Sequence, residues 1–195
     1  MIRFFDILFS MIGLILASPL FIILSIWIKV DSKGPVFFVQ ERVGRNDMNF
    51  SLYKFRSMFY KSQDNNQITI GYRDPRITRL GYFIRRYKLD ELPQLINVFF
   101  GQMSLVGPRP EVRKYVNLYN EDQRVILSVK PGITDYASIK FVNENDLLAK
   151  STDPEKIYLQ EILPQKIELN MIFINNPSLR HYFQIILLTI KRLFN

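Results

Sequence analysis

The longest apolar stretch of the sequence lies near its N-terminal end, where residues 7–28 include no charged side chain. Arg3 and Asp6 precede this stretch, and Lys29 follows it. A helix over these 22 residues is about 33 Å long, close to the roughly 30 Å hydrocarbon core of a bilayer. The stretch predicts a membrane helix, because a cleaved signal peptide usually has a shorter apolar core that ends at a small-residue site.

The dipeptide Ser18-Pro19 interrupts this stretch near its middle. Proline lacks a backbone N–H and clashes with the carbonyl four residues earlier, so a helix kinks or breaks there. The Ser18 hydroxyl can donate to a carbonyl that Pro19 leaves free. A kinked helix that spans the bilayer and a bent helix that enters and leaves on one side both fit this pattern. The flanking charges give little orientation signal, so the pattern alone leaves the topology open.

Beyond this stretch the pattern becomes that of a folded polar domain. Residues 36–39 and 50–56 alternate around a turn-rich segment, which predicts a β-hairpin. Residues 179–194 carry an apolar stripe among basic residues, which predicts a helix that packs on the core or lies in a membrane interface. We expect residues 1–33 to form a membrane anchor and residues 34–195 to form the domain that carries the chemistry.

Composition limits that chemistry. The chain of 195 residues is 48% hydrophobic, which supports a sizeable core and argues against disorder. It has no cysteine and a single histidine, His181, so cysteine nucleophiles, cysteine–zinc sites and histidine-based triads do not fit. Carboxylates, Lys, Arg or hydroxyl groups must therefore do any catalysis. A net charge of +8 favours an anionic partner, which is nucleic acid, an anionic membrane or a phosphorylated substrate.

Basic and aromatic residues crowd together just before two acidic residues. The crowded residues are Tyr72, Arg73, Arg76, Arg79, Tyr82, Arg85, Arg86, Tyr87 and Lys88. Such a mixture can bind nucleic acid through charge and stacking. However, Asp90 and Glu91 follow directly, and carboxylates repel phosphodiesters unless a metal ion intervenes. The combination favours metal-assisted phosphoryl chemistry.

The acidic pair coincides with a predicted helix start. Apolar residues recur at helical intervals from Leu92 to Phe99, Gly101 is a plausible stop, and Pro93 is tolerated only in a first turn. We therefore predict a helix that begins near Asp90, with Asp90 as its N-cap. Free amides and the helix dipole favour anions at such a position. An acidic cap without a chemical role is the alternative.

Two loops further along supply other candidates. Residues 104–110 hold Arg109 between two prolines, which fix its neighbours in extended geometry and limit the entropy lost when the guanidinium binds phosphate. An ordinary rigid corner is the alternative. Residues 130–136 are predicted to form a turn whose Tyr136 can stack on a base, although a plain surface turn explains them as well.

These strings together resemble those of the bacterial sugar transferases, specifically the small monotopic phosphoglycosyl transferases that load a sugar phosphate onto a polyprenyl phosphate. The resemblance spans nearly the whole chain. Its strings are Ser18-Pro19, Gly34-Pro35-Val36-Phe37, Gln40-x-Arg42-x-Gly44, Lys54-Phe55-Arg56-Ser57-Met58, Thr78-Arg79-x-Gly81, Leu89-Asp90-Glu91-Leu92-Pro93-Gln94, Met103-Ser104-x-x-Gly107-Pro108-Arg109-Pro110 and Pro131-Gly132-Ile133-Thr134. Each string alone is weak, but their common order argues strongly against accidental similarity.

The resemblance implies an α+β fold. It consists of an N-terminal re-entrant membrane helix, broken at Ser18 and Pro19, and a small, mainly helical cytoplasmic catalytic domain with a short β-hairpin and interfacial amphipathic helices. The implied location is the cytoplasmic face of the bacterial inner (plasma) membrane, with monotopic topology.

The resemblance also implies roles for individual residues. In that family the Asp of the Asp-Glu pair is the nucleophile and Mg²⁺ is held beside it, which places catalysis and metal binding on Asp90 and Glu91. The Arg five residues before the Asp, Arg85 here, is implied as a phosphate contact, and Arg109 supports the same anionic region. The remaining cations that we expect to bind substrate phosphate are Arg79, Lys54 and Arg56.

The implied reaction transfers a sugar 1-phosphate from a UDP-sugar, with an N-acetylated aminosugar expected, to undecaprenyl or another polyprenyl phosphate. UMP leaves, and a covalent aspartyl-phosphosugar forms on Asp90. This is the first membrane step of capsule, O-antigen, exopolysaccharide or glycoprotein-glycan synthesis. Membrane lipids are expected partners, nucleic acid is not, and a homodimer is compatible with the sequence. The alternative is a non-catalytic, membrane-tethered module that binds nucleic acid or anionic lipid and has no need of Asp90 and Glu91.

Two positions depart from the family pattern. Gln102 stands where family members usually carry Asp, so a structural role of that acid is in question. Asp135 stands where they usually carry Gly, and a different string follows through Phe141. The second departure lies where nucleotide or sugar recognition is expected, so the sequence leaves the identity of the sugar open.

Overall fold

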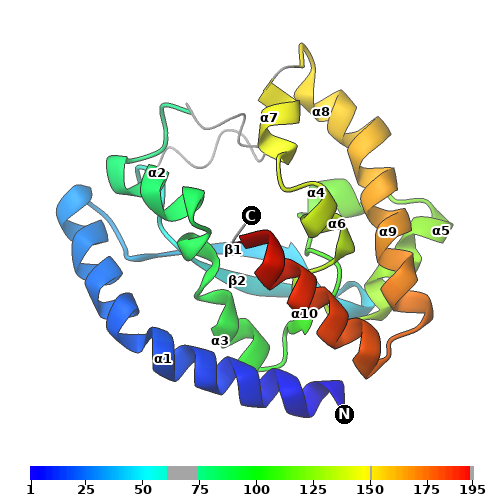
Figure 1. The fold of residues 1–195 in the computed structure, drawn as a ribbon. Coiled ribbons are helices and arrows are strands. Elements are labelled where there is room, and N and C mark those ends of the chain that lie inside the picture. The colour runs from blue at the N-terminus through cyan, green and yellow to red at the C-terminus, as the bar shows by residue number, and fades with distance from the viewer. Residues whose placement is uncertain (61–73, 150, 194–195) are drawn as a thin grey trace.

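The computed structural model describes residues 1–60, 74–149 and 151–193. Figure 1 shows one long helix, α1 (Ile2–Asp31), beside a domain of shorter helices and strands. The strands of the described residues form two two-stranded sheets. The expected class, a mixed helix and strand fold with a long apolar N-terminal helix and a mainly helical domain, is confirmed.

Helix α1 does not break at Ser18 and Pro19, contrary to the prediction. The helix continues through Pro19, and Figure 1 shows it as a curved helix. Proline leaves the carbonyl of Ile15 without its usual helical donor. The Ser18 hydroxyl donates to that carbonyl at 2.8 Å, which satisfies it. By length and composition, α1 is long and apolar enough to cross a membrane.

The N-terminal end of α1 is fixed to the domain by polar contacts. The Asp6 carboxylate is only 2% exposed, and its Oδ1 accepts hydrogen bonds from the Ser104 hydroxyl, the Leu105 N–H and the Tyr182 hydroxyl, each at 2.9 Å. Arg3 donates to two carbonyls at the end of α3 (Gln94–Phe99). These contacts join the start of α1 to segments about a hundred and more residues away in the sequence.

The C-terminal end of α1 packs on the same domain through apolar side chains. They belong to a buried cluster formed by Leu24, Ile28, Phe55, Leu80 and Ile84. Between its two docked ends, α1 exposes apolar side chains such as Ile15, Leu16, Ile22 and Ile23. The helix packs on the domain at both ends, and in between it approaches α3 so closely that a Cβ on Gly13 would lie 3.1 Å from Leu95 Cδ1. The exposed side of this middle part is apolar.

The predicted hairpin is confirmed. Strands β1 (Phe37–Val43) and β2 (Asn49–Phe55) pair in antiparallel register, with Phe37 opposite Phe55. The short turn η1 (Arg45–Asp47) joins them. Lys54 lies near the end of β2, which brings it beside the acidic pair.

A second sheet replaces the loop and the turn that the sequence predicted. Strands β3 (Ser104–Val106) and β4 (Gly132–Thr134) pair in parallel. The backbones come so close beyond β3 that a Cβ on Gly132 would lie 2.1 Å from the Gly107 nitrogen. Only glycine fits there, and this close approach anchors the loop that carries Arg109.

Helices complete the domain around these sheets. They are α2 (Arg79–Arg86), η2 (Leu89–Glu91), α3 (Gln94–Phe99), α4 (Arg113–Val116), α5 (Glu121–Arg124), η3 (Val125–Ser128), α6 (Tyr136–Lys140), α7 (Glu144–Ala149), α8 (Pro154–Ile157), η4 (Tyr158–Ile162), α9 (Leu163–Asn175) and α10 (Leu179–Leu193). The predicted C-terminal helix is α10. It buries Tyr182 and Ile185 in the core but exposes Leu187, Leu188 and Ile190. Its apolar surface therefore extends beyond the part that packs on the core.

Candidate active site

The acidic pair lies in a tight turn rather than at the start of an α-helix, so the prediction that Asp90 is an N-cap is wrong. Asp90 and Glu91 belong to η2, and α3 begins only after Pro93. Because Pro93 has no N–H, it cannot bond the Leu89 carbonyl in an α-helical ladder. The Leu92 N–H bonds that carbonyl instead, which closes the shorter turn.

The residue before this turn adopts a left-handed backbone conformation. Lys88 has φ 56° and ψ 20°, which is uncommon for a residue with a side chain. Such a conformation costs about 1–3 kcal/mol, and it tends to occur at functional sites. The strained residue thus directly precedes the turn that carries Asp90 and Glu91.

The carboxylate of Asp90 is buried but not sealed. Its side chain accepts no hydrogen bond within the described part of the chain, and its residue is 8% exposed. Burial raises the pKa of Asp90, and the charge of Glu91 raises it further, whereas Lys54 and Arg85 lower it. Asp90 is therefore an open carboxylate within the electrostatic reach of several cations.

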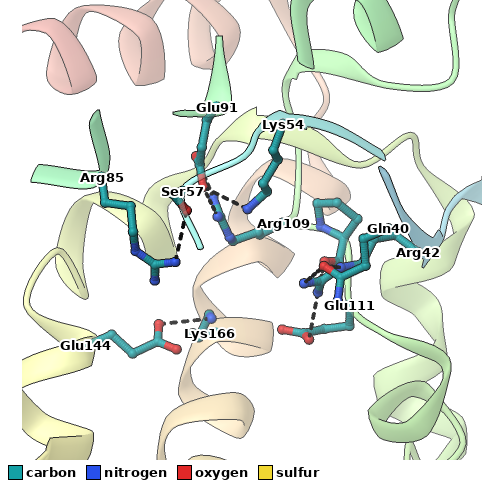
Figure 2. A network of polar contacts seen from close by, with 11 residues as sticks. Gln40, Arg42, Lys54, Ser57, Arg85, Glu91, Arg109, Glu111, Glu144 and Lys166 are labelled. Atoms are coloured by element: carbon teal, nitrogen blue, oxygen red, sulfur yellow. Dashed lines mark hydrogen bonds and ion pairs between the residues drawn. The ribbon is translucent and has the colours of Figure 1, made fainter. Parts of the chain in front are cut away.

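Glu91 is held by two cations. Arg109 donates both Nη atoms to the carboxylate, with Nη1 3.1 Å from Oε2, and the Lys54 Nζ lies 3.2 Å from Oε1, as Figure 2 shows. Burial opposes the ionisation of Glu91, but the charges of Arg109 and Lys54 and the hydrogen bond from Arg109 outweigh it. The pKa of Glu91 is held well below its usual value.

The structure brings three of the five predicted phosphate-binding cations to the acidic pair. Lys54 and Arg109 contact Glu91 directly, and the charge of Arg85 acts on Asp90. Arg85 lies at the end of α2, where its Nη1 is 3.5 Å from the Ser57 hydroxyl. These three cations make the region around Asp90 attractive to phosphate.

Arg56 and Arg79, the other two predicted phosphate-binding cations, form no ion pair with the acidic pair among the described residues. The Arg56 guanidinium is buried against the C-terminal end of α1, where it donates to the carbonyls of Ile28 at 3.1 Å, Ser32 at 2.6 Å and Lys33. A cation at a helix C-terminus satisfies free carbonyls and the helix dipole, and this capping position replaces the predicted role of Arg56 in phosphate binding. Arg79 is exposed at the first residue of α2. Arg73 and Tyr72 lie outside the described residues.

Sequence reasoning missed a second polar group beside Arg109. The Arg42 guanidinium donates to Gln40 Oε1 and to the carbonyl of Pro110 at 3.0 Å, and it lies 3.7 Å from Glu111 (Figure 2). The hydroxyl of Tyr158 donates to the Glu111 carboxylate. Through the Pro110 carbonyl, this group holds the loop that carries Arg109.

A buried lysine on α9 was also missed. The Lys166 Nζ lies 3.1 Å from Glu144 Oε2 and 5.2 Å from the centre of the Tyr158 ring. Figure 2 shows this pair facing the region that Arg85 and Arg109 border. The only sequence signal was a lysine among apolar residues of a helix, which is commonly read as a solvent-exposed position.

The acidic pair fits a magnesium ion that is also bound by phosphate. No group of three or more His, Cys, Asp or Glu residues that could hold a metal ion occurs within the described residues. Mg²⁺ usually needs only one or two carboxylates together with substrate phosphates. Among the described residues, no group donates to the oxygens of Asp90, and Oε2 of Glu91 accepts from Arg109, so both residues keep lone pairs for a cation.

The departure at Gln102 is accommodated by a hydrogen bond. Its Oε1 accepts from Asn97 Nδ2 at 2.7 Å. Asn97 also donates to the Ser51 carbonyl at 2.7 Å and accepts from the Tyr53 N–H at 3.1 Å, which ties α3 to β2. Gln102 therefore supports the link between the hairpin and the helix that follows the acidic pair.

The chain is similar to known proteins. The family described as bacterial sugar transferase matches residues 1–195. The chain is 37% identical over 200 residues to the UDP-glucose:undecaprenyl-phosphate glucose-1-phosphate transferase of Klebsiella pneumoniae. The matched segment covers 98% of the chain and 40% of that protein. It is 41% identical over 140 residues to the UDP-N-acetylgalactosamine-undecaprenyl-phosphate N-acetylgalactosaminephosphotransferase of Aeromonas hydrophila. That matched segment covers 70% of the chain and 33% of the Aeromonas protein. The chain thus spans 33% to 40% of the length of these two relatives.

Proposed function

The chain belongs to the bacterial sugar transferase family, and from this premise we propose that it transfers a sugar 1-phosphate from a UDP-sugar to undecaprenyl or another polyprenyl phosphate. The names of its relatives support this class of donor and acceptor. The observation that carries the proposal is the open carboxylate of Asp90, which lies among cations while Glu91 is already paired with Lys54 and Arg109.

In the first step an oxygen of Asp90 attacks the phosphorus that bears the sugar. The bond from that phosphorus to the oxygen that bridges to the uridine side breaks, and UMP leaves with the electron pair. Asp90 then carries the sugar phosphate as an acyl phosphate, an intermediate that carboxylates form in other phosphoryl transfers. The charges of Arg85, Lys54 and Arg109 stabilise the negative charge that develops in the transition state.

In the second step the phosphate of the polyprenyl acceptor attacks the same phosphorus. The bond to the Asp90 oxygen breaks, the carboxylate is regenerated, and the product is a polyprenyl diphosphate sugar. Asp90 and Glu91 would hold Mg²⁺ together with the phosphates of the substrate. When bound, this ion supplies positive charge that neutralises and orients the phosphates.

The paired state of Glu91 gives it a separate task in this scheme. With its pKa held low, Glu91 stays ionised and keeps Arg109 and Lys54 in place. Preorganised charges of this kind need no rearrangement during the reaction, which is where electrostatic catalysis gains most of its effect.

The contacts of α1 support a re-entrant anchor formed by residues 1–33. Asp6 and Ile28 lie near opposite ends of the helix, yet both are buried against the same domain. A straight spanning helix would carry one end to the other side of the bilayer, away from that domain. We place residues 34–195 on the cytoplasmic face of the inner membrane, with the exposed apolar middle of α1 entering the lipid.

Two other apolar surfaces fit an interface with lipid. Trp27 of α1 packs against Phe83 of α2 with 6.0 Å between ring centres, and the neighbouring Tyr87 is exposed. Helix α10 exposes Leu187 and Leu188. Aromatic residues with basic neighbours are typical of membrane interfaces. This placement brings the soluble donor and the lipid-bound acceptor to one site.

We expect the sugar to be an N-acetylated aminosugar, which the name of the Aeromonas relative supports. The Klebsiella relative is named for glucose, so a panel of UDP-sugars decides between them. Purified protein with Mg²⁺ and undecaprenyl phosphate should release UMP from one or a few members of the panel.

Substitution of the nucleophile tests the mechanism. Asp90→Asn should abolish UMP release while the melting temperature stays near that of the wild type, because the side chain of Asp90 accepts no hydrogen bond within the described residues. Asp122→Asn, at an exposed acid of α5, is the matched control and should leave the rate unchanged. Unchanged release by Asp90→Asn contradicts the nucleophile. No release from any UDP-sugar contradicts the activity and favours a non-catalytic, membrane-tethered module.

A further inference from the structure

Asp135, which takes no part in the steps above, uses both oxygens of its carboxylate at the junction of β4 and α6. The residue is 2% exposed. Its Oδ1 accepts from the Ser138 N–H and thereby caps α6. Its Oδ2 accepts from the Arg109 backbone N–H at 2.9 Å and from Asn170 Nδ2 at 3.0 Å. The carboxylate thus joins three segments, one of which carries Arg109.

The hydrogen bond to Arg109 has no backbone substitute nearby. Arg109 stands between Pro108 and Pro110, which have no N–H, so its own N–H is the only backbone donor of this segment. The preceding backbone contacts join Gly107 N–H to the Thr134 carbonyl at 3.0 Å and Gly132 N–H to the Pro108 carbonyl at 2.9 Å. The Asp135 side chain extends this set of contacts by one residue, to the backbone of Arg109.

Asn170 fixes the orientation of the Asp135 carboxylate. It is 3% exposed and lies on α9, four residues after Lys166, so the two side chains share one face of the helix. Lys166 holds Glu144, and Asn170 holds Asp135. The charge of Glu91 is the main cause that raises the pKa of Arg109, with smaller increases from Glu144 and Asp135. The face of α9 therefore anchors two acids that act on Arg109.

We propose that Asp135 is a positioning residue, which fixes the backbone of Arg109 so that its guanidinium meets both Glu91 and the diphosphate of the donor, and that Asn170 aligns Asp135. The inference rests on the proposed function, because it requires Arg109 to contact substrate phosphate. Displacement of a catalytic group by about 1 Å can slow a reaction about 100-fold.

The test separates the contact with Arg109 from the cap of α6. Serine is also a good N-cap but is too short to hold both Ser138 and Arg109, so Asp135→Ser keeps the cap and removes the contact. We expect single-turnover UMP formation to slow by about 10- to 100-fold, with little change in the KM of the polyprenyl acceptor. The melting temperature should fall, because the Arg109 N–H and the buried Asn170 amide lose their acceptor, so the rates are compared at a temperature at which both proteins are fully folded.

A double-mutant cycle with Arg109→Lys decides whether the effect passes through Arg109. Lysine lacks the bidentate geometry, so Arg109→Lys should slow the donor step by itself. If Asp135 acts by positioning Arg109, Asp135→Ser should cause little further loss in the Arg109→Lys background. An equal loss in both backgrounds, or no loss in the wild-type background, overturns the inference.

Two results distinguish this inference from the proposed function. If Arg109→Lys has the wild-type rate, Arg109 does not serve the donor, and the role given to it in the proposed function fails. If Arg109→Lys is slow while Asp135→Ser is not, only the positioning by Asp135 fails. Should Asp135→Ser not fold, the same cycle with Asn170→Ala decides, and a loss of several-fold that disappears in the Arg109→Lys background is expected.

Discussion

Replacing Asp6 with alanine should loosen the N-terminal end of α1 from the domain. The Asp6 carboxylate is 2% exposed, and one of its oxygens accepts three hydrogen bonds at 2.9 Å. The donors are the Ser104 hydroxyl, the Leu105 N–H and the hydroxyl of Tyr182, which is 0% exposed. Asp6→Ala leaves these buried donors without their acceptor.

The magnitude follows from these contacts. A hydrogen bond to a charged group contributes about 1.5–3 kcal/mol, but three bonds that share one oxygen are not additive. Each buried donor left without its acceptor costs about 1–3 kcal/mol, so for the three donors together we expect a loss of about 3–5 kcal/mol. At about 2–4 °C per kcal/mol for a chain of this size, the melting temperature should fall by about 6–20 °C. Tyr182→Phe removes one donor of the three, so its effect should be clearly smaller.

The assay is thermal unfolding in detergent or nanodiscs, followed by tryptophan fluorescence. Trp27 is the single tryptophan, and it lies near the other end of α1 from Asp6, in contact with Phe83. Its signal therefore reports loss of the whole fold rather than local fraying beside Asp6. A melting temperature for Asp6→Ala within about 2 °C of the wild type refutes the reasoning. So does a Tyr182→Phe variant that is destabilised as strongly as Asp6→Ala.

Three further predictions concern the charged groups. Glu91→Gln leaves the partly buried Lys54 and Arg109 without the carboxylate that pairs with both. Unfolding by denaturant should therefore show a loss of about 1.5–3 kcal/mol, and a loss under about 0.5 kcal/mol contradicts the pairing. The pKa of Asp90 is raised above 3.8, and only the ionised carboxylate attacks. As the pH is lowered, the rate of UMP release should therefore begin to fall with a midpoint above pH 3.8. A midpoint at or below that value contradicts the burial of Asp90. Arg56→Met should lower the melting temperature, since the carbonyls that end α1 lose their donors, without changing the KM of the UDP-sugar, and a large change in that KM contradicts the capping position.

The hydrophobic pattern of neighbouring residues predicted three parts of the fold. The apolar stretch became α1, the alternating residues became β1 and β2, and the C-terminal stripe became α10. The break expected at Pro19 did not form, because the Ser18 hydroxyl satisfies the carbonyl of Ile15. The expected N-cap at Asp90 failed because Pro93 delays the start of α3.

The site was predictable only in part. The string around Asp90 and Glu91 and the prolines around Arg109 predicted a candidate centre, and the structure pairs Arg109 with Glu91. Contacts between distant segments left no comparable signal. Asp135 accepts hydrogen bonds from Arg109, 26 residues away, and from Asn170, 35 residues away, and no periodicity in the sequence predicts such pairs.

The central claim is that Asp90 becomes covalently bonded to the sugar phosphate. The most direct measurement is mass spectrometry of protein that is incubated with the preferred UDP-sugar and Mg²⁺, without polyprenyl phosphate, and then quenched and digested. The account predicts a sugar-phosphate mass on the peptide that contains Asp90, absent from Asp90→Asn and lost when polyprenyl phosphate is added. UMP release without any adduct, or an adduct on another residue, contradicts the account.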